Sequence, residues 1–319
     1  MPKSFKPAFG LKNKHLQTLY SSLFRKDLKL NFEIEIFEFD DKDFVDCYWY
    51  NKQNDKDIVV LFHGLAGSFK SPYIQGTMKT LSENGFSPVL MHFRGCSGRD
   101  NKLPRAYHSG DTNDALSFLK SIKKRFPNSK IFAIGYSLGG NMLLKLLGEL
   151  KENKLIEKAI SVSAPLQLDI SANKMNKGLS KFYQAYLLKD LKQQLKKKYN
   201  QHDMQSLIKL NKQEIKTLRN FWQFDDVYTA KIHGYESASD YYKKSSAKQY
   251  LKDIQTQTLI IHALDDPFMT PEILPSKNGL SKNIILEIYP NGGHVGFIGG
   301  TIFRPIYWLE KRIIDFLKN

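Results

Sequence analysis

The amino-acid sequence predicts an α/β fold, in which a mostly parallel sheet is covered by helices on both faces. Nearly continuous apolar runs have the length of buried strands, at 58–62, 88–93, 131–135, 159–163, 258–262 and 284–289. Segments with helical periodicity lie near 72–84, 111–124, 139–150 and 306–318. Buried strands that alternate with helices form parallel sheets covered on both sides.

Two segments depart from this alternation. Residues 31–39 and 44–50 alternate apolar and polar side chains around a turn at 40–43, which predicts an opening antiparallel hairpin with one face in water. Between 165 and 250 the strand pattern disappears, and the sequence becomes helical and rich in Lys, Leu and Tyr. We therefore expect a single domain over 1–319 with a helical lid inserted at 165–250.

A glycine-flanked serine follows one of the predicted buried strands. Gly135-Tyr136-Ser137-Leu138-Gly139 stands between an apolar strand and an apolar helix, which is the arrangement of a nucleophile elbow. The turn from strand to helix is so tight that the positions two before and two after the serine must lack bulk. We predict that Ser137 is a catalytic nucleophile rather than a structural turn serine.

The groups that would activate this serine follow in chain order. His294 comes after the last predicted strand, and Asp265 and Asp266 come after the strand before it. Asp266 stands three residues beyond Ala263, a spacing typical of the orienting acid, so we favour it over Asp265. The predicted catalytic residues are therefore Ser137, Asp266 and His294.

Donors for a developing oxyanion are expected on the loop after the first buried strand. That strand runs into His63-Gly64-Leu65, where glycine lets the chain turn, so the amides of Leu65 and Leu138 can both point inward. We expect His63 to shape this loop and Cys96 to be a packing residue rather than a thiol nucleophile. Since the remaining histidines lack metal-ligand spacing, we expect no metal and no cofactor.

Longer strings extend these motifs over nearly the whole chain. They are His15-Leu16-Gln17-Thr18, His63-Gly64-Leu65-Ala66-Gly67-Ser68, Met91-His92-Phe93-Arg94-Gly95-Cys96-Ser97-Gly98, Tyr107-His108-Ser109-Gly110-Asp111, Ile232-His233-Gly234-Tyr235, Asp265-Asp266-Pro267-Phe268 and Gly292-Gly293-His294-Val295-Gly296-Phe297. Through them the chain resembles the AB-hydrolase 4 family of α/β-hydrolases, with bacterial YheT-like, plant EMB8-like and animal ABHD-type members. The resemblance implies an α/β-hydrolase fold and an esterase-like enzyme that uses Ser137, His294 and an aspartate of the 265/266 pair on small or lipid-like esters.

The predicted lid has an apolar stripe at helical spacing, formed by Leu179, Phe182, Tyr183, Tyr186 and Leu187. Such a stripe is ordinarily core, but here it is also compatible with the mouth of an apolar site, and we predict that Phe182 and Tyr186 bind substrate. Four lysines follow at 192 and 196–198. They could meet an anionic membrane, but a solvated lysine face has the same pattern, so we do not expect membrane recruitment.

Another group of residues, Arg94, Asn101, Tyr107 and His108, follows the second buried strand. These side chains could line the substrate pocket or could lock their loop together. The sequence leaves both possibilities open.

Composition limits the other classes of function. Lys and Arg number 48 against 32 Asp and Glu, a net charge of +16, but the lysines are dispersed and no nucleic-acid motif accompanies them. Two distant cysteines exclude a disulfide framework, and no signal-like or spanning apolar segment is present. We expect a cytoplasmic enzyme that binds no nucleic acid; the oligomeric state does not follow from the sequence.

The function predicted from these features is hydrolysis of a carboxylic ester through an acyl-serine intermediate. Two alternatives remain open at the level of sequence. An acyltransferase would use the same three residues, and a catalytically silent binding protein could retain the fold.

Overall fold

The structure is a computed structural model that describes residues 4–152 and 155–319. Its centre is an eight-stranded sheet in the order β1-β2-β4-β3-β5-β6-β7-β8, in which β2 runs antiparallel to both neighbours and the other pairs are parallel. The strands are β1 (Phe32–Glu38), β2 (Phe44–Tyr50), β3 (Ile58–Phe62), β4 (Ser87–Met91), β5 (Ile131–Tyr136), β6 (Lys158–Val162), β7 (Gln257–Ala263) and β8 (Ile284–Tyr289).

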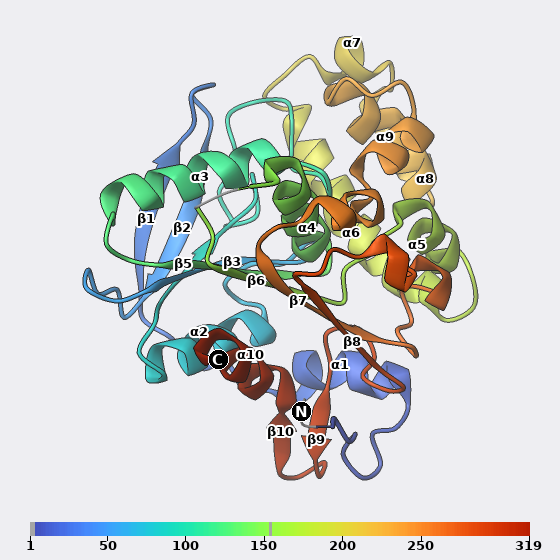
Figure 1. The fold of residues 1–319 in the computed structure, drawn as a ribbon. Helices are drawn as coiled ribbons and strands as arrows, with labels where there is room; N and C mark the ends of the chain where they lie inside the picture. The colour runs from blue at the N-terminus through green and yellow to red at the C-terminus, as the bar shows by residue number, and fades with distance from the viewer. Residues whose placement is uncertain (1–3, 153–154) are drawn as a thin grey trace.

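Helices cover both faces of this sheet (Figure 1). α2 (Pro72–Glu83) and α10 (Trp308–Lys318) pack on one face, and α3 (Thr112–Arg125) and α4 (Leu138–Leu150) pack on the other. Side chains of β3 alternate between the two apolar cores, with Val59 and Leu61 in one and Val60 and Phe62 in the other. The prediction of a mostly parallel, doubly covered sheet is therefore confirmed.

The opening hairpin corrects one expectation. β2 is buried on both faces because it lies inside the sheet, between β1 and β4. On β1, Ile34 and Ile36 are 55% and 59% exposed, whereas Glu35 is partly covered and pairs with Arg125 of α3 at 2.8 Å. The prediction that one face of the hairpin lies in water was therefore wrong for β2; on β1 the exposed side chains include Ile34 and Ile36, because α3 lies against Glu35.

The last strand is also less buried than its apolar sequence predicts. Ile285 and Ile288 of β8 are exposed, and β8 ends the sheet with a strand neighbour on one side only. Its run of apolar residues resembles that of a central strand, so the prediction of a buried strand at 284–289 was wrong for this edge.

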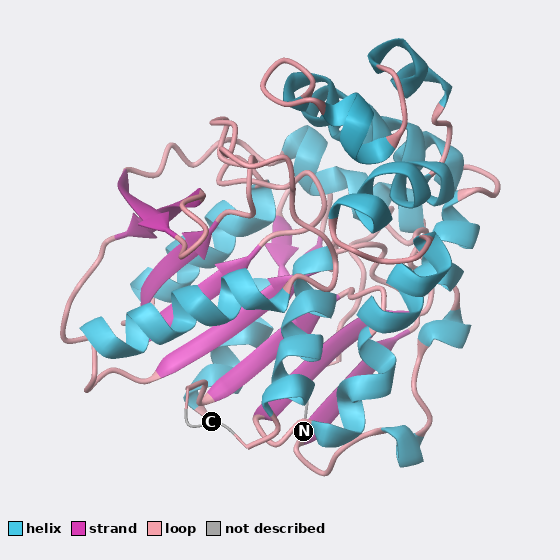
Figure 2. Ribbon diagram, turned by 90° about the horizontal axis from the view of Figure 1, so that it is seen from above, coloured by secondary structure: helices cyan, strands magenta, loops and turns pink. Residues whose placement is uncertain are grey.

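Between β6 and β7, a range that the structure describes throughout, the chain forms helices and no strand. These elements are α5 (Leu168–Met175), α6 (Ser180–Lys198), α7 (Met204–Ile208), η1 (Lys212–Thr217), α8 (Phe221–Phe224), η2 (Asp225–Ala230), α9 (Ala238–Ser245) and η3 (Ala247–Asp253). They gather beyond one end of the strands (Figures 1 and 2). They contribute apolar clusters of their own, including Leu188, Leu195 and Met204.

The remaining elements were not predicted from the sequence. They are α1 (Lys14–Phe24), β9 (Ile298–Gly300), β10 (Pro305–Tyr307) and the short 3-10 turns η4 (Pro271–Ile273) and η5 (Lys277–Gly279). Asn13 begins α1 by accepting hydrogen bonds from the amides of His15 and Leu16. No helix in the described ranges is long and apolar enough to cross a lipid bilayer.

Candidate active site

Ser137 occupies the tight turn between β5 and α4. Its backbone has φ 51° and ψ −117°, a conformation that costs energy for a residue with a side chain. A Cβ atom at Gly135 would lie 2.4 Å from the carbonyl oxygen of Gly139, and one at Gly139 would lie 2.6 Å from that of Phe62. The two glycines therefore allow strand, turn and helix to approach closely enough to hold the serine above the sheet edge.

The structure brings the three predicted catalytic side chains into one line of hydrogen bonds. Ser137 Oγ lies 2.9 Å from His294 Nε2, and His294 Nδ1 lies 2.8 Å from Asp266 Oδ2. With the proton on Nδ1, the imidazole donates to Asp266 and accepts from the serine hydroxyl. The side chain of Asp266 is almost wholly buried, so its interaction with His294 is little screened by water.

The neighbouring aspartate has a different environment. Asp265 Oδ1 accepts a hydrogen bond from the amide of Gly293 at 2.9 Å, and Oδ2 accepts one from Asn291 at 3.3 Å. Asp265 thus fastens the loop that carries His294 but does not contact the imidazole ring. Of the two aspartates, Asp266 has the geometry of an orienting acid.

Helix α1 supports the histidine loop from far away in the sequence. The amide of His294 donates to Thr18 Oγ1 at 2.9 Å. The buried Gln17 accepts from the amide of Ile298 at 2.7 Å and donates to the carbonyl oxygens of Leu11 and Ile298. The sequence analysis noted the string at 15–18 but assigned it no role, because the burial of Gln17 and the contact of Thr18 with His294 are visible only in the folded chain.

An aromatic ring fixes the plane of the imidazole. Phe268 stacks on His294 with ring centroids 4.0 Å apart and planes inclined by 12°. The amide of Phe268 also donates to Asp266 Oδ1 at 2.8 Å, so this residue contacts both partners. Sequence reasoning assigned Phe268 no role either.

The loop predicted to bind the oxyanion lies against the first turn of α4, since a Cβ atom at Gly139 would lie 2.6 Å from the carbonyl oxygen of His63. Neither the amide of Leu65 nor that of Leu138 has a hydrogen-bond partner among the described residues, and both residues line the cavity over Ser137. The adjacent amides are occupied, since Gly64 donates to the Tyr73 hydroxyl and Ala66 donates to the Tyr107 hydroxyl. The amides of Leu65 and Leu138 are therefore free donors in residues that line the cavity over Ser137.

His63 holds this loop in place through two hydrogen bonds. Its Nδ1 donates to the carbonyl oxygen of Gly64, and its Nε2 accepts from the amide of Phe93. Burial lowers the pKa of His63 to about 3, so the ring is neutral at ordinary pH. With both nitrogens occupied, His63 has the geometry of a loop-shaping residue.

A cavity of about 860 Å³ opens over Ser137 and His294, between the core of the protein and the helical insertion. All five residues of the apolar stripe line it, and Phe182 and Tyr186 are 73% and 68% exposed. Leu19 and Leu23 of α1 line it as well. The stripe is thus not ordinary core, although contact with a substrate remains a prediction.

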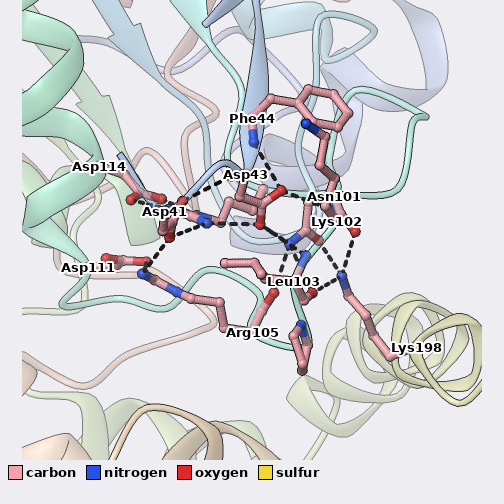
Figure 3. Close-up of polar contacts among 12 residues, drawn as sticks. Asp41, Asp43, Phe44, Asn101, Lys102, Leu103, Arg105, Asp111, Asp114 and Lys198 are labelled. Carbon is pink, nitrogen blue, oxygen red and sulfur yellow. Dashed lines mark hydrogen bonds and ion pairs between the residues drawn. The ribbon is translucent and has the colours of Figure 1, made fainter. Parts of the chain in front are cut away.

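The structure distinguishes the roles of the four residues in the loop after β4 that the sequence analysis left open. Arg94 is buried and bonds to Asp43 at 2.8 Å and to Asp114 at 2.6 Å, which ties the loop to the opening hairpin and to α3. Asn101 bonds to Asp43 in the same network (Figure 3). Tyr107 and His108 line the cavity, and so does part of Asn101. Arg94 therefore locks the loop, while the other three also border the cavity.

Cys96 packs in this loop. Burial raises the pKa of its thiol to about 12, and its side chain hydrogen-bonds with Tyr107 and Gln194. A thiol in this setting is a poor nucleophile. In the described ranges, no group of three or more His, Cys, Asp or Glu side chains is placed to hold a metal ion.

The four lysines of α6 do not form one solvated face. Lys198 is buried against the loop after β4, Lys197 pairs with Asp100 at 2.8 Å, and Lys192 donates to the carbonyl oxygen of Lys216. The expectation of a solvated lysine face was wrong for Lys198, because it packs against the core of the protein, whereas Lys196 and Lys197 are exposed.

Comparison with known proteins gives the family. Residues 57–301 match the family model described as the α/β hydrolase fold. The chain belongs to the α/β-hydrolase family. It is 42% identical over 316 residues to the putative esterase YheT of Escherichia coli strain K12, an alignment that covers 98% of this chain and 92% of that protein.

More distant relatives place the chain within that family. It is 28% identical to the embryogenesis-associated protein EMB8 of Picea glauca, over 96% of this chain and 70% of that one. It is 30% identical to a monoacylglycerol lipase of Saccharomyces cerevisiae, over 84% of this chain and 60% of that one. The predicted membership in the group of YheT-, EMB8- and ABHD-type α/β-hydrolases is confirmed.

Solved structures agree on the fold. The esterase Pf2001 of Pyrococcus furiosus superimposes with a TM-score of 0.58, covering 92% of this chain and 94% of that one, at 18% identity. At this identity the likeness concerns the fold alone.

Proposed function

We propose that the protein is a carboxylic ester hydrolase that acts through an acyl-serine on Ser137. The observation that carries this proposal is the pair of hydrogen bonds from Ser137 to His294 and from His294 to Asp266, at 2.9 and 2.8 Å. The names of the relatives, a putative esterase and a monoacylglycerol lipase, support an ester of a small or lipid-like molecule as substrate.

In the first half of the reaction, Ser137 Oγ attacks the ester carbonyl carbon while its proton passes to His294 Nε2. The negative charge that develops on the carbonyl oxygen is held by the amides of Leu65 and Leu138 and by the N-terminus of α4. When the tetrahedral intermediate collapses, the bond to the alcohol oxygen breaks. That oxygen takes the proton from His294, and the acyl group stays on the serine.

In the second half, water attacks the acyl-serine. His294 removes a proton from the water, and the same two amides hold the second oxyanion. Collapse releases the carboxylic acid and returns the proton to Ser137. Asp266 keeps the imidazole in one tautomer and stabilises the imidazolium that forms in each half.

The helical insertion over 165–250 acts as a lid in this proposal. It completes the cavity above Ser137, and Phe182 and Tyr186 contribute apolar surface that suits an acyl chain.

The test combines covalent labelling with turnover. A fluorophosphonate probe should modify Ser137 in the wild type, located by peptide mass spectrometry, and should leave Ser137→Ala unmodified. Hydrolysis of p-nitrophenyl esters should fall by several orders of magnitude in the folded Ser137→Ala variant. Turnover of that variant near the wild-type rate would contradict the proposal, as would an unlabelled Ser137 in the wild type.

A further inference from the structure

Two helices present apolar side chains to solvent at the edge of the cavity over Ser137. The residues concerned are 37% to 73% exposed, and all of them except Leu16 also line the cavity. They are Leu16, Leu19 and Leu23 of α1, and Leu179, Phe182 and Tyr186 at the start of α6. Single exposed apolar residues are ordinary, whereas a contiguous group marks a binding surface. These six residues are called the mouth surface below.

His15 joins the two parts of the mouth surface. Its Nδ1 lies 3.0 Å from the hydroxyl oxygen of Tyr183, and the two rings stack with centroids 5.8 Å apart. His15 directly precedes Leu16 in the chain, and Tyr183 directly follows Phe182. The apolar residues of α1 and α6 therefore meet at this contact and border one opening.

Cations without anions surround the mouth surface. Residues 4–26 contain four lysines and one arginine, residues 170–189 contain four lysines, and neither segment contains Asp or Glu. None of these eight lysines forms an ion pair with another described residue. Exposed lysines elsewhere do, as Lys42 pairs with Glu38 and Lys130 with Glu157.

The cations of the two segments also lie close together. Burial, and then the charges of Lys14 and Lys174, lower the pKa of His15. Lys14 begins α1 and Lys174 is in α5, so cations from both segments act on the ring that joins the mouth surface. On α6, the exposed Lys181 and Lys189 flank Phe182 and Tyr186.

The exposed apolar residues of β1 have the opposite surroundings. Ile34 and Ile36 alternate with Glu33 and Glu35, and they are not among the residues that line the cavity. Exposure of apolar side chains is thus common to both places. The unpaired cations and the bordering cavity distinguish the mouth surface.

We propose that the mouth surface docks on an anionic lipid bilayer. Its apolar side chains enter the headgroup region, and the lysines of 4–26 and 170–189 lie against lipid phosphates. A second copy of this chain would bring like charges together, and a protein partner would cover the opening of the cavity. A bilayer matches the charge and supplies apolar ligands at that opening.

The lysines at 192 and 196–198, on which the expectation against membrane recruitment was based, have no part in this surface. The inference also stands independently of the proposed function, because docking requires no reaction at Ser137.

Vesicle flotation tests docking on the Ser137→Ala protein, in which the proposed hydrolysis is removed. The vesicles contain phosphatidylcholine alone or with about 30% phosphatidylglycerol. At low salt, binding to the anionic vesicles should be at least about 10-fold stronger than to the neutral ones, and it should weaken in about 0.5 M salt. Absence of binding to the anionic vesicles at low salt would overturn the inference.

A pair of double variants tests the apolar part of the surface. Leu23→Ser with Phe182→Ser should weaken binding to anionic vesicles at least about 10-fold, because both residues lose exposed apolar area. Ile34→Ser with Ile36→Ser is the matched control and should stay within about 2-fold of the parent protein. An equal loss in the two double variants, or no loss in the first, would contradict docking through the mouth surface.

A second pair tests the charges at constant net charge. Lys177→Glu with Lys181→Glu should weaken binding at least about 10-fold, since both lysines are exposed beside Leu179. Lys120→Glu with Lys124→Glu changes the net charge equally on exposed positions of α3, and we expect a loss of about 3-fold or less. Equal losses would show that net charge alone attracts the protein, which would overturn the inference.

A fluorescent label locates the contact directly. The native Cys47 and Cys96 are buried, so a nitrobenzoxadiazole label can be directed to Leu16→Cys or Ile36→Cys. Anionic vesicles should shift the emission to the blue at Leu16→Cys and leave it unchanged at Ile36→Cys. A shift at both positions or at neither would overturn the proposal. A shift at Leu16→Cys that grows with protein concentration in the absence of vesicles would assign the surface to a second copy instead.

Discussion

At the scale of single residues, two adjacent aspartates hold different positions around His294. Asp266 accepts from the imidazole, whereas Asp265 accepts from the amide of Gly293. Asp266→Asn should lower kcat on p-nitrophenyl butyrate by about three to four orders of magnitude, because an amide no longer holds the required tautomer or stabilises the imidazolium.

Asp265→Asn is the matched comparison. An asparagine oxygen can still accept from Gly293, so we expect a loss of about 10-fold or less. Both rates should be measured on protein with a native circular-dichroism spectrum. A larger effect at 265 than at 266 would identify Asp265 as the acid.

Asp225 in the lid, whose carboxylate accepts hydrogen bonds from Thr229 Oγ1 and the Tyr242 hydroxyl, gives a prediction for stability against pH. Burial raises its pKa from 3.8 to about 6, so the folded state binds more protons than the unfolded state between these values. The contribution of Asp225 to the free energy of unfolding is therefore greatest below pH 4, falls as the pH rises through 6, and stays low above it. The whole rise in pKa is worth about 3 kcal/mol.

Asp225→Asn removes this titration but weakens one of two hydrogen bonds, at a cost of about 1 kcal/mol. At pH 8 the variant should be more stable than the wild type by about 1–2 kcal/mol in urea denaturation. The gain should shrink as the pH falls from 6 to 4. A gain that is the same at pH 4 and pH 8 would show that charge burial is not its cause.

At the scale of elements, apolar pattern predicted the strands well where both faces are covered. β3, β5 and β6 are buried almost throughout, as their sequences indicate. The pattern was less informative for β1 and β8, because the helices that cover a strand and the order of strands in the sheet depend on the arrangement in space, which a local pattern does not contain. The fold class followed from the sequence, whereas the burial of its two edges did not.

The candidate site also has features that could be predicted from the sequence and features that could not. Ser137, Asp266 and His294 were found because each follows a strand end with a recognisable neighbour, and their catalytic roles remain predictions. The hydrogen bond from the His294 amide to Thr18 could not be predicted from the sequence, because the two residues are 276 positions apart. The position of Asp225 likewise depends on a π-helical turn, for which no sequence signal was read.

The exposed end of α6 yields a prediction for acyl specificity. Phe182→Ala and Tyr186→Ala should each lower kcat/KM for p-nitrophenyl decanoate about 10-fold relative to the acetate, because each removes apolar surface from the cavity wall. Phe303→Ala is the control, since Phe303 is also a strongly exposed aromatic residue, at 94%, but is not among the residues that line the cavity. An unchanged chain-length preference in both lid variants would remove these residues from the acyl site.

At the scale of the whole molecule, buried polar contacts join parts of the chain that are distant in sequence. One network of hydrogen bonds links Asp43 in the opening hairpin, Arg94 in the loop after β4 and Asp114 in α3. Asn101 extends it to Lys198, at the end of α6 (Figure 3). The helical insertion is thus held to the loop after β4 at the end of α6.

Lys198 is the residue of the helical insertion that makes this contact. Its ammonium group donates to the carbonyl oxygen of Asn101 at 2.9 Å, to Asn101 Oδ1 at 2.6 Å and to the carbonyl oxygen of Leu103 at 2.6 Å. Burial lowers its pKa to about 8, so the group is mostly charged at neutral pH. The two Asn101 oxygens have no other donor among the described residues, whereas the carbonyl oxygen of Leu103 also accepts from Asn101 Nδ2 at 3.2 Å.

Lys198→Met keeps the aliphatic stem and removes the donor, which leaves acceptors unsatisfied at a cost of about 2–4 kcal/mol in the free energy of unfolding. Lys197→Met is the neighbouring control, because its pair with Asp100 is half exposed and is worth about 1 kcal/mol or less. Hydrogen exchange at pH 7 should accelerate at 99–104 and 196–202 in Lys198→Met, with no change at 138–147. Equal destabilisation by the two variants would mean that the buried lysine does not fasten the lid.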